Sequence, residues 1–160
     1  MVLREIVKNV ESSPEYKKFH KENPDYHLAS VFSVGNVEWN VGYYSKKSDK
    51  MVTFDTNPIK MNPPDDVFKK EGTVHSLDMT KVKTRIDQVN RICDELTTKK
   101  YKTTDVTKKI IILQHHEQLI YNITLLTSTF NVINIRIDAS NGNILHDSMS
   151  SALSFQDKTA

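Results

Sequence analysis

Apolar residues recur at helical spacing in three segments of this chain. From Leu3 to Val10 they return every three or four positions, which predicts one face of an amphipathic helix. A second helix is predicted to begin at Pro14, because a serine before a proline suits the N-cap and the first helical turn. A third, with Asp87 as its predicted N-cap, carries an apolar stripe between Val89 and Leu96.

Alternating apolar and polar residues follow each helical region and predict antiparallel strands. The predicted strands cover residues 26–34, 39–44, 51–56, 110–113, 119–127, 132–137 and 144–146. Such a sheet has one apolar face that must be covered, and the preceding helix is the nearest apolar surface. The predicted fold class is therefore α+β, with a helix and an antiparallel sheet in each half. The pattern leaves open whether the two sheets join edge to edge.

A proline-rich segment separates the two halves. Three of the five prolines are Pro58, Pro63 and Pro64, and proline cannot donate a hydrogen bond inside a sheet. Residues 58–80 are therefore predicted to form a connector, although Ile59–Met61 could extend a sheet edge. The predicted domains are residues 1–57, this connector, and residues 81–149; residues 150–160 are read as a polar tail.

The two halves also resemble each other residue by residue. Trp39–Val41 aligns with Tyr121–Ile123, and Val52–Asp55 aligns with Ile135–Asp138. The single-residue change between these matches falls in the intervening turn, where insertions are best tolerated. We therefore predict a duplicated unit of one helix and several strands.

The second half resembles a PepSY domain. The resemblance is carried by the helix at Asp87–Leu96, by Tyr121–Ile123 with an aromatic residue near the start of a strand, and by Ile135–Ile144. In this last segment a strand ends in a hydrophobic–Asp–Ala turn that is closed by glycine and another hydrophobic residue. The first half is a more degenerate copy, with Asn57–Pro58 where the second half has Asn141–Gly142.

Residues 23–51 are also similar to uncharacterised archaeal PepSY-like proteins. The resemblance implies two PepSY-like or cystatin-like repeats acting as a binding or regulatory fold. Members of that family are often associated with peptidase inhibition or propeptides. The resemblance carries over no catalytic residues.

Composition narrows the classes of function. The chain has 160 residues, 22 Lys and Arg against 20 Asp and Glu, and a net charge of +2. This balance argues against a dedicated nucleic-acid binder on electrostatic grounds. No apolar run approaches the roughly 20 residues needed to span a bilayer. The first ten residues contain Arg4, Glu5 and Lys8, which do not suit a signal peptide. A single cysteine cannot form an internal disulfide, which suits a reducing compartment. Together these features predict a cytoplasmic protein without a membrane partner.

No motif for phosphate, dinucleotide, acyl-transfer or redox chemistry is present in the sequence. Cys93 lies on the apolar stripe of the third helix, which favours a structural thiol. Asp55 and Asp138 occupy equivalent repeat positions at strand ends, where aspartate is typical of turns. We therefore expect no enzyme activity, no cofactor and no bound metal.

Two alternatives remain from the sequence. A metal-dependent hydrolase could use His115 and His116, with His75 or His146 as further ligands. Adjacent residues of a strand point to opposite faces, so a solvated hairpin end is preferred. A weak nucleic-acid site could form in the Lys46–Lys50 hairpin, but acidic residues are interspersed along the chain.

The remaining candidate is a surface for a protein partner. If Trp39, Val41 and Tyr43 face the core, Tyr44 faces outward beside the basic hairpin. The predicted partner-binding residues are Tyr44, Lys46, Lys47 and Lys50. The leading hypothesis is a non-catalytic binding or regulatory module that binds a protein partner or forms a homodimer through an open sheet edge.

Overall fold

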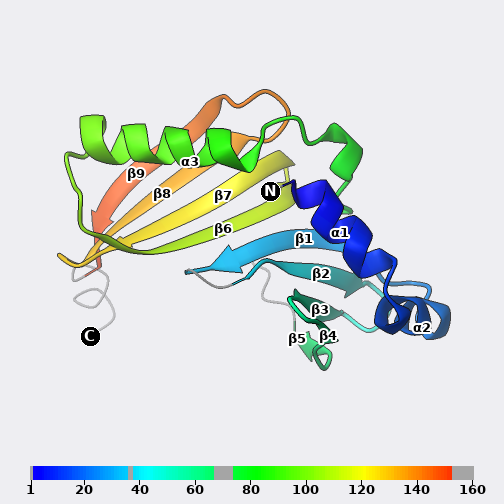
Figure 1. Ribbon diagram of the computed structural model, residues 1–160. Coiled ribbons are helices and arrows are strands. Elements are labelled where there is room, and N and C mark those ends of the chain that lie inside the picture. Colours follow the sequence, from blue (N-terminus) through cyan, green and yellow to red (C-terminus); the bar gives the residue numbers. More distant parts are fainter. Residues whose placement is uncertain (1, 36–37, 67–73, 153–160) are drawn as a thin grey trace.

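The computed structural model describes residues 2–35, 38–66 and 74–152 (Figure 1). The first half contains helices and strands in the order α1 (Leu3–Glu11), α2 (Pro14–Glu22), β1 (His27–Val34), β2 (Asn40–Ser45), β3 (Lys50–Thr56), β4 (Ile59–Met61) and β5 (Asp65–Asp66). The second half contains the 3₁₀ turn η1 (Met79–Lys81), α3 (Ile86–Glu95), the π turn η2 (Leu96–Lys100), β6 (Val106–His116), β7 (Gln118–Thr127), β8 (Asn131–Asp138) and β9 (Ile144–Ser151).

The two halves share one sheet. Within the described residues this sheet has nine strands in the order β4-β3-β2-β1-β6-β7-β8-β9, with β5 paired to β3, and every pairing is antiparallel. The joint is the pairing of β1 with β6, in which Val31 lies opposite Leu113. The α+β class predicted from the sequence is confirmed, and the sheets join edge to edge through the first strand of each half.

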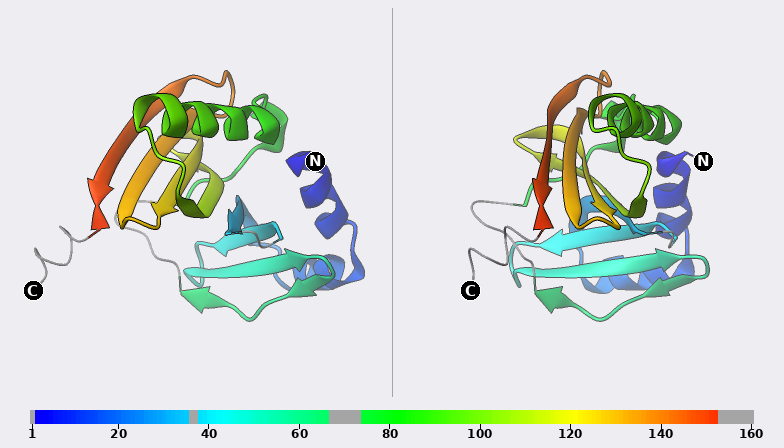
Figure 2. Two further views of the ribbon diagram at one scale, coloured as in Figure 1. Left: turned by 60° about the vertical axis from the view of Figure 1, so that its left-hand side comes forward. Right: turned by 90° about the vertical axis from the view of Figure 1, so that its left-hand side faces the viewer.

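A single buried row runs across the sheet at this joint. The row consists of Phe54, Val41, Val31, Leu113, Tyr121 and Ile137, each paired with the next, and each at most 1% exposed. These side chains belong to one core cluster together with apolar residues from all three α-helices. Figure 1 shows α3 lying along the strands of the second half, with α1 and α2 beside those of the first. The helices of both halves therefore pack on the same face of the sheet, and Figure 2 shows the arrangement from two further sides.

The N-terminus of α3 differs from the predicted capping. Helix α3 begins at Ile86, and its N-cap is Arg85 rather than the predicted Asp87. The backbone N–H of Arg85 donates to Gln88 Oε1 at 2.9 Å. Asp87 lies in the first turn, where it pairs with Arg85 at 3.2 Å and complements the positive helix end.

The structure adds detail to two predicted segments. The segment at residues 58–80 contains β4, β5 and η1, so much of it belongs to ordered structure; the option that Ile59–Met61 extends a sheet edge is confirmed. The polar tail was placed from residue 150, yet β9 continues to Ser151 because its residues pair with β8. The predicted turn at Gly35–Asn36 lies partly outside the described residues, as do residues 153–160 of the predicted tail.

Strand pairing differs between the two halves at the aligned positions. The alignment placed Val41 on Ile123 and Phe54 on Ile137. In the sheet Val41 lies opposite Phe54. Ile137, however, lies opposite Tyr121, two positions before Ile123. A shift of two residues keeps every side chain on its own face, so the apolar pattern could not reveal it.

Candidate functional site

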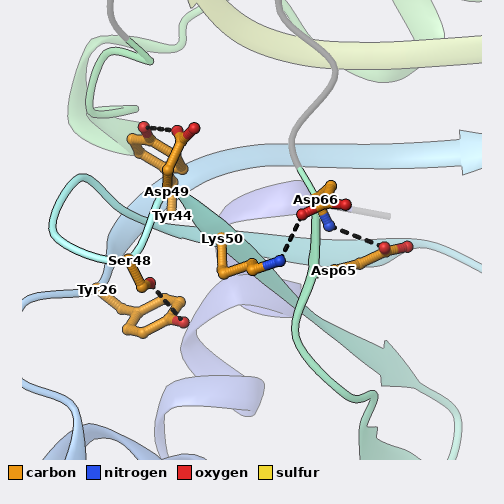
Figure 3. A network of polar contacts seen from close by, with 7 residues as sticks. All are labelled: Tyr26, Tyr44, Ser48, Asp49, Lys50, Asp65 and Asp66. Atoms are coloured by element: carbon orange, nitrogen blue, oxygen red, sulfur yellow. Dashed lines mark hydrogen bonds and ion pairs between the residues drawn. The ribbon is translucent and has the colours of Figure 1, made fainter.

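The hairpin between β2 and β3 is fixed by polar contacts on both sides (Figure 3). The hydroxyl of Tyr44 donates to Asp49 Oδ1 at 2.5 Å, within the hairpin itself. The hydroxyls of Tyr26 and Ser48 lie 3.3 Å apart and connect the hairpin to the start of β1. Asp49 has a φ of 53°, the left-handed conformation that aspartate tolerates in turns. These contacts therefore fix the conformation of the hairpin.

Carboxylates hold the two ends of this hairpin. At one end, Asp25 accepts a hydrogen bond from the hydroxyl of Ser45, which lowers the pKa of that carboxyl. At the other, Lys50 Nζ forms an ion pair with Asp66 of β5, and this contact raises the pKa of the lysine. Asp66 is itself positioned by its backbone N–H, which donates to Asp65 at 2.8 Å (Figure 3).

The structure separates the four predicted partner-binding residues. Tyr44 does face away from Tyr43, but it is only 1% exposed, because the His27 ring lies edge-on against it at 5.7 Å and Asp49 binds its hydroxyl. Lys50 is engaged with Asp66. Only Lys46 and Lys47 are exposed, at the tip of the hairpin.

A groove of about 440 Å³ opens beside the hairpin, and we call it the aromatic groove. It lies where the end of α1, the start of β1 and the segment leading into η1 meet. Four of its lining residues are apolar, and six are polar or aromatic. Its lining residues are Val7, Glu11, Tyr16, Tyr26, His27, Leu28, Tyr43, Leu77, Asp78 and Met79.

Glu11 is the distinctive residue of the aromatic groove. It is the last residue of α1, so its carboxylate lies at the negative end of the helix dipole, where an acid is disfavoured. The hydroxyl of Tyr43 donates to Glu11 Oε2 at 3.0 Å. Burial, and then the charge of Glu11, raise the pKa values of Tyr43 and Tyr16.

Each tyrosine ring of the groove packs against another aromatic ring. The Tyr16 and Tyr43 ring centres lie 5.0 Å apart, and Phe19 lies 5.0 Å from Tyr26. A second carboxylate, Asp78, also lines the groove, and Thr80 donates to it through its backbone N–H at 3.0 Å and its hydroxyl at 2.6 Å. These bonds lower the pKa of Asp78. The groove thus combines rigid aromatic rings with two acidic groups.

The histidines singled out in the sequence are only partly brought together. His115, near the end of β6, has its ring centre 5.2 Å from that of His75. His116 is exposed next to the turn, and His146 contacts Ser148 at 3.2 Å on β9. Across the described ranges, no three His, Cys, Asp or Glu side chains form a group that could hold a metal ion.

Cys93 and the repeated aspartates have structural positions. Cys93 is 1% exposed in the core, and burial raises the pKa of its thiol to about 11, as expected for a structural cysteine. Asp138 accepts from the backbone N–H of Ser140 at 2.8 Å, which confirms a turn former. Asp55 instead accepts from Asn40 at 2.7 Å and Asn62 at 3.0 Å, so it links neighbouring segments rather than its own turn.

The predicted open edge of the sheet is present at β9. Within the described residues, β9 has one strand neighbour, β8. Three apolar side chains are 43–45% exposed on this strand: Ile144, Leu145 and Met149. The homodimer expected from the sequence stays a prediction.

Sequence reasoning did not find the aromatic groove. Its residues come from α1, α2, β1, β2 and the approach to η1, and no spacing pattern links them. One local signal existed, because Glu11 places an acid at the end of a helix where a basic residue is favoured.

Comparisons with known proteins give one fold-level match. No protein-family model matches the sequence, and no curated protein sequence matches it. A crystal structure from Clostridium difficile 630, described as that of a "putative lipoprotein", has a similar fold with a TM-score of 0.52. The two sequences are 13% identical, and the match covers 85% of this chain and 90% of the other. The similarity concerns the fold, and the PepSY resemblance stays a prediction.

This match corrects the predicted cytoplasmic location. The protein with the similar fold is described as a "putative lipoprotein", and on this ground the expectation of a cytoplasmic chain is withdrawn. That expectation rested on a lone cysteine, which is buried in α3, and on the composition of the first ten residues. In the described part of the chain, no helix is both long and apolar enough to cross a bilayer.

Proposed function

We propose that this protein is a non-catalytic binding module whose ligand site is the aromatic groove. The single observation that carries the proposal is the placement of Glu11. Its carboxylate lies at the unfavourable end of a helix, in a groove lined by Tyr16, Tyr26 and Tyr43. A bound positive charge would relieve the repulsion between this carboxylate and the helix end.

The chemistry of the lining supports a cationic ligand. Aromatic faces attract ammonium and guanidinium groups, and the attraction is strongest where water is excluded. Glu11 and Asp78 both line the groove and add negative charge to it. We propose that the ligand is a peptide segment carrying a lysine or arginine side chain. The tyrosine rings have few rotatable bonds and are already packed in place, which limits the entropy lost on binding.

The neighbouring hairpin extends this surface. Tyr26 lines the groove, and its hydroxyl also contacts that of Ser48 in the hairpin. The groove and the hairpin are therefore in direct contact. Lys46 and Lys47 are exposed at its tip and are available to acidic residues of the same partner. Because the hairpin is already held by Asp25 and Asp66, little order is lost when a partner binds.

The proposal is tested by titrating the protein with short arginine peptides while recording amide NMR spectra. The matched ligand contains citrulline, which has the shape of arginine without its charge. We expect shifts confined to the groove, and an affinity about tenfold weaker in Glu11→Gln, equivalent to about 1.4 kcal/mol. Glutamine still accepts the hydrogen bond from Tyr43, so this variant removes charge while keeping the local packing.

Glu22→Gln is the control, since it removes the same charge from an exposed position at the end of α2. Its affinity should equal that of the parent protein. Equal binding of the arginine and citrulline peptides, or shifts outside the groove, would refute a cation site. Undetectable binding of the arginine peptide at millimolar concentration would also refute the proposal.

We also propose that the two halves derive from one repeated unit and that the protein acts outside the cytoplasm. The first is supported by the common order of a helix followed by an antiparallel run of strands in each half. An experimental structure in which the row Val31, Val41 and Phe54 fails to superpose on Leu113, Tyr121 and Ile137 would count against it.

The proposal that the protein acts outside the cytoplasm is supported by the "putative lipoprotein" with a similar fold. Fractionation of native cells, with detection by antibody, decides the location.

A further inference from the structure

Two histidines from distant parts of the chain lie against each other at the end of the sheet joint. His75 precedes η1, and His115 lies near the end of β6. Their ring centres are 5.2 Å apart, with an angle of 60° between the ring planes. They meet because the segment entering η1 runs along β1, where Leu77 N–H donates to Leu28 O at 2.9 Å, and β1 is paired with β6.

One nitrogen of this pair has no protein partner. His115 Nδ1 is buried, and it is the one buried side-chain nitrogen or oxygen without a hydrogen bond in the part of the chain that the structure describes. Leaving a buried polar atom unpaired costs free energy, so an atom without a protein partner usually binds a water molecule or an ion. A neutral imidazole presents one lone pair, which is the group that binds a metal.

The geometry points to a metal site: we propose that His75 and His115 together bind one divalent transition-metal ion, with zinc as the reference ion. Two imidazoles bound to one tetrahedral ion at about 2.0–2.1 Å per nitrogen have ring centres roughly 5 Å apart, which agrees with the spacing of this pair. Imidazole suits zinc, copper and nickel, whereas magnesium and calcium prefer oxygen.

The proposed site has two protein ligands, and water completes the coordination. It differs from the adjacent His115–His116 pair considered from the sequence, because His116 is exposed on the hairpin and His75 takes its place. The site is also independent of the aromatic groove, since neither histidine lines that groove. Either proposal can fail without affecting the other.

The test is calorimetric titration of the full chain with zinc chloride, with magnesium chloride as the contrasting ion. We expect one zinc per chain, a Kd below about 100 μM and no detectable magnesium binding. His75→Ala should weaken zinc binding at least tenfold. His75 is exposed, so this variant removes a ligand without opening the core. His115→Ala should have the same effect, with circular dichroism to verify its fold.

His116→Ala and His146→Ala are the matched controls, and both should bind zinc like the parent protein. Loss of binding in His116→Ala would assign zinc to the neighbouring pair and overturn the proposal. Full binding in His75→Ala, or no binding of zinc up to about 1 mM, would overturn it as well. If His115→Ala does not fold, the comparison of His75→Ala with His116→Ala decides alone.

Discussion

Val31 of β1 lies directly opposite Leu113 of β6, and both side chains are fully buried. This pair stands at the centre of the row that crosses the sheet from Phe54 to Ile137. A contact at this position stabilises both halves, because each half contributes one of the two side chains. The two halves should therefore unfold together, although each contains its own helices and strands.

Leu113→Ala tests this coupling. Truncating a buried leucine costs about 2–5 kcal/mol, and the loss should appear in the first half as well as in the second. Trp39 is the only tryptophan and packs against the core before β2, so its fluorescence reports on the first half. In urea, the Trp39 transition of Leu113→Ala should move to lower denaturant together with the circular dichroism signal.

Leu145→Ala is the control for that experiment. Leu145 is 44% exposed on β9, so its truncation should change stability by no more than about 0.5 kcal/mol. If the Trp39 transition stayed in place while circular dichroism moved, the halves would be separate folding units and the joint would contribute little.

Gly42 and Ser30 approach closely between β2 and β1, where they are paired. A Cβ added at Gly42 would lie 2.7 Å from Ser30 Oγ, closer than non-bonded atoms allow. Gly42→Ala should therefore destabilise the protein by about 1–3 kcal/mol. Ser30→Ala in the same chain removes the clashing oxygen and should recover most of the loss. Urea denaturation of the two single variants and the double variant measures this as a coupling energy.

Asp105 should give the protein a dependence on acid. Hydrogen bonds from Thr103, and then from Ser128, hold the pKa of this carboxyl well below its usual value of 3.8. The folded state therefore favours the ionised form, which stabilises the protein above the unfolded pKa and ceases to do so as the pH falls toward the folded pKa. Asp105→Asn should lower the urea midpoint at pH 7, and its difference from the parent should shrink between about pH 4 and pH 2.

Asp94→Asn is the comparison for the acid experiment, since Asp94 is an exposed residue of α3. The urea midpoint of Asp94→Asn should equal that of the parent protein at pH 7 and at pH 2. A constant difference between Asp105→Asn and the parent from pH 7 to pH 2 would mean that the charge of Asp105 does not contribute to stability.

Much of the sheet could be predicted because alternation of apolar residues is a direct signal of burial on one face. Seven predicted strands correspond to β1, β2, β3, β6, β7, β8 and β9. Strand β5 could not be found in this way, since Asp65 and Asp66 are exposed and carry no apolar signal. Its pairing arises from the backbone and from the ion pair of Asp66 with Lys50.

The candidate sites were harder to predict, because both depend on contacts between distant segments. The alternation rule correctly turned Tyr44 away from Tyr43, but it could not indicate that Asp49 and His27 bury it. Likewise, adjacent histidines drew attention to His116, whereas the ring beside His115 comes from His75. Periodicity tells which face a residue occupies and gives no information on which segment covers it.

The β1–β6 pairing has a consequence for how the chain folds. It brings residue 31 against residue 113, whereas β1–β2, β6–β7 and β8–β9 are local hairpins. Closing a long loop is entropically costly, so local hairpins and their helices are expected to form first and the joint last. Until then, each half presents the bare edge of its first strand. Such an edge can pair with its proper partner or with the same edge of another molecule, so the joint is also the point at which folding competes with aggregation.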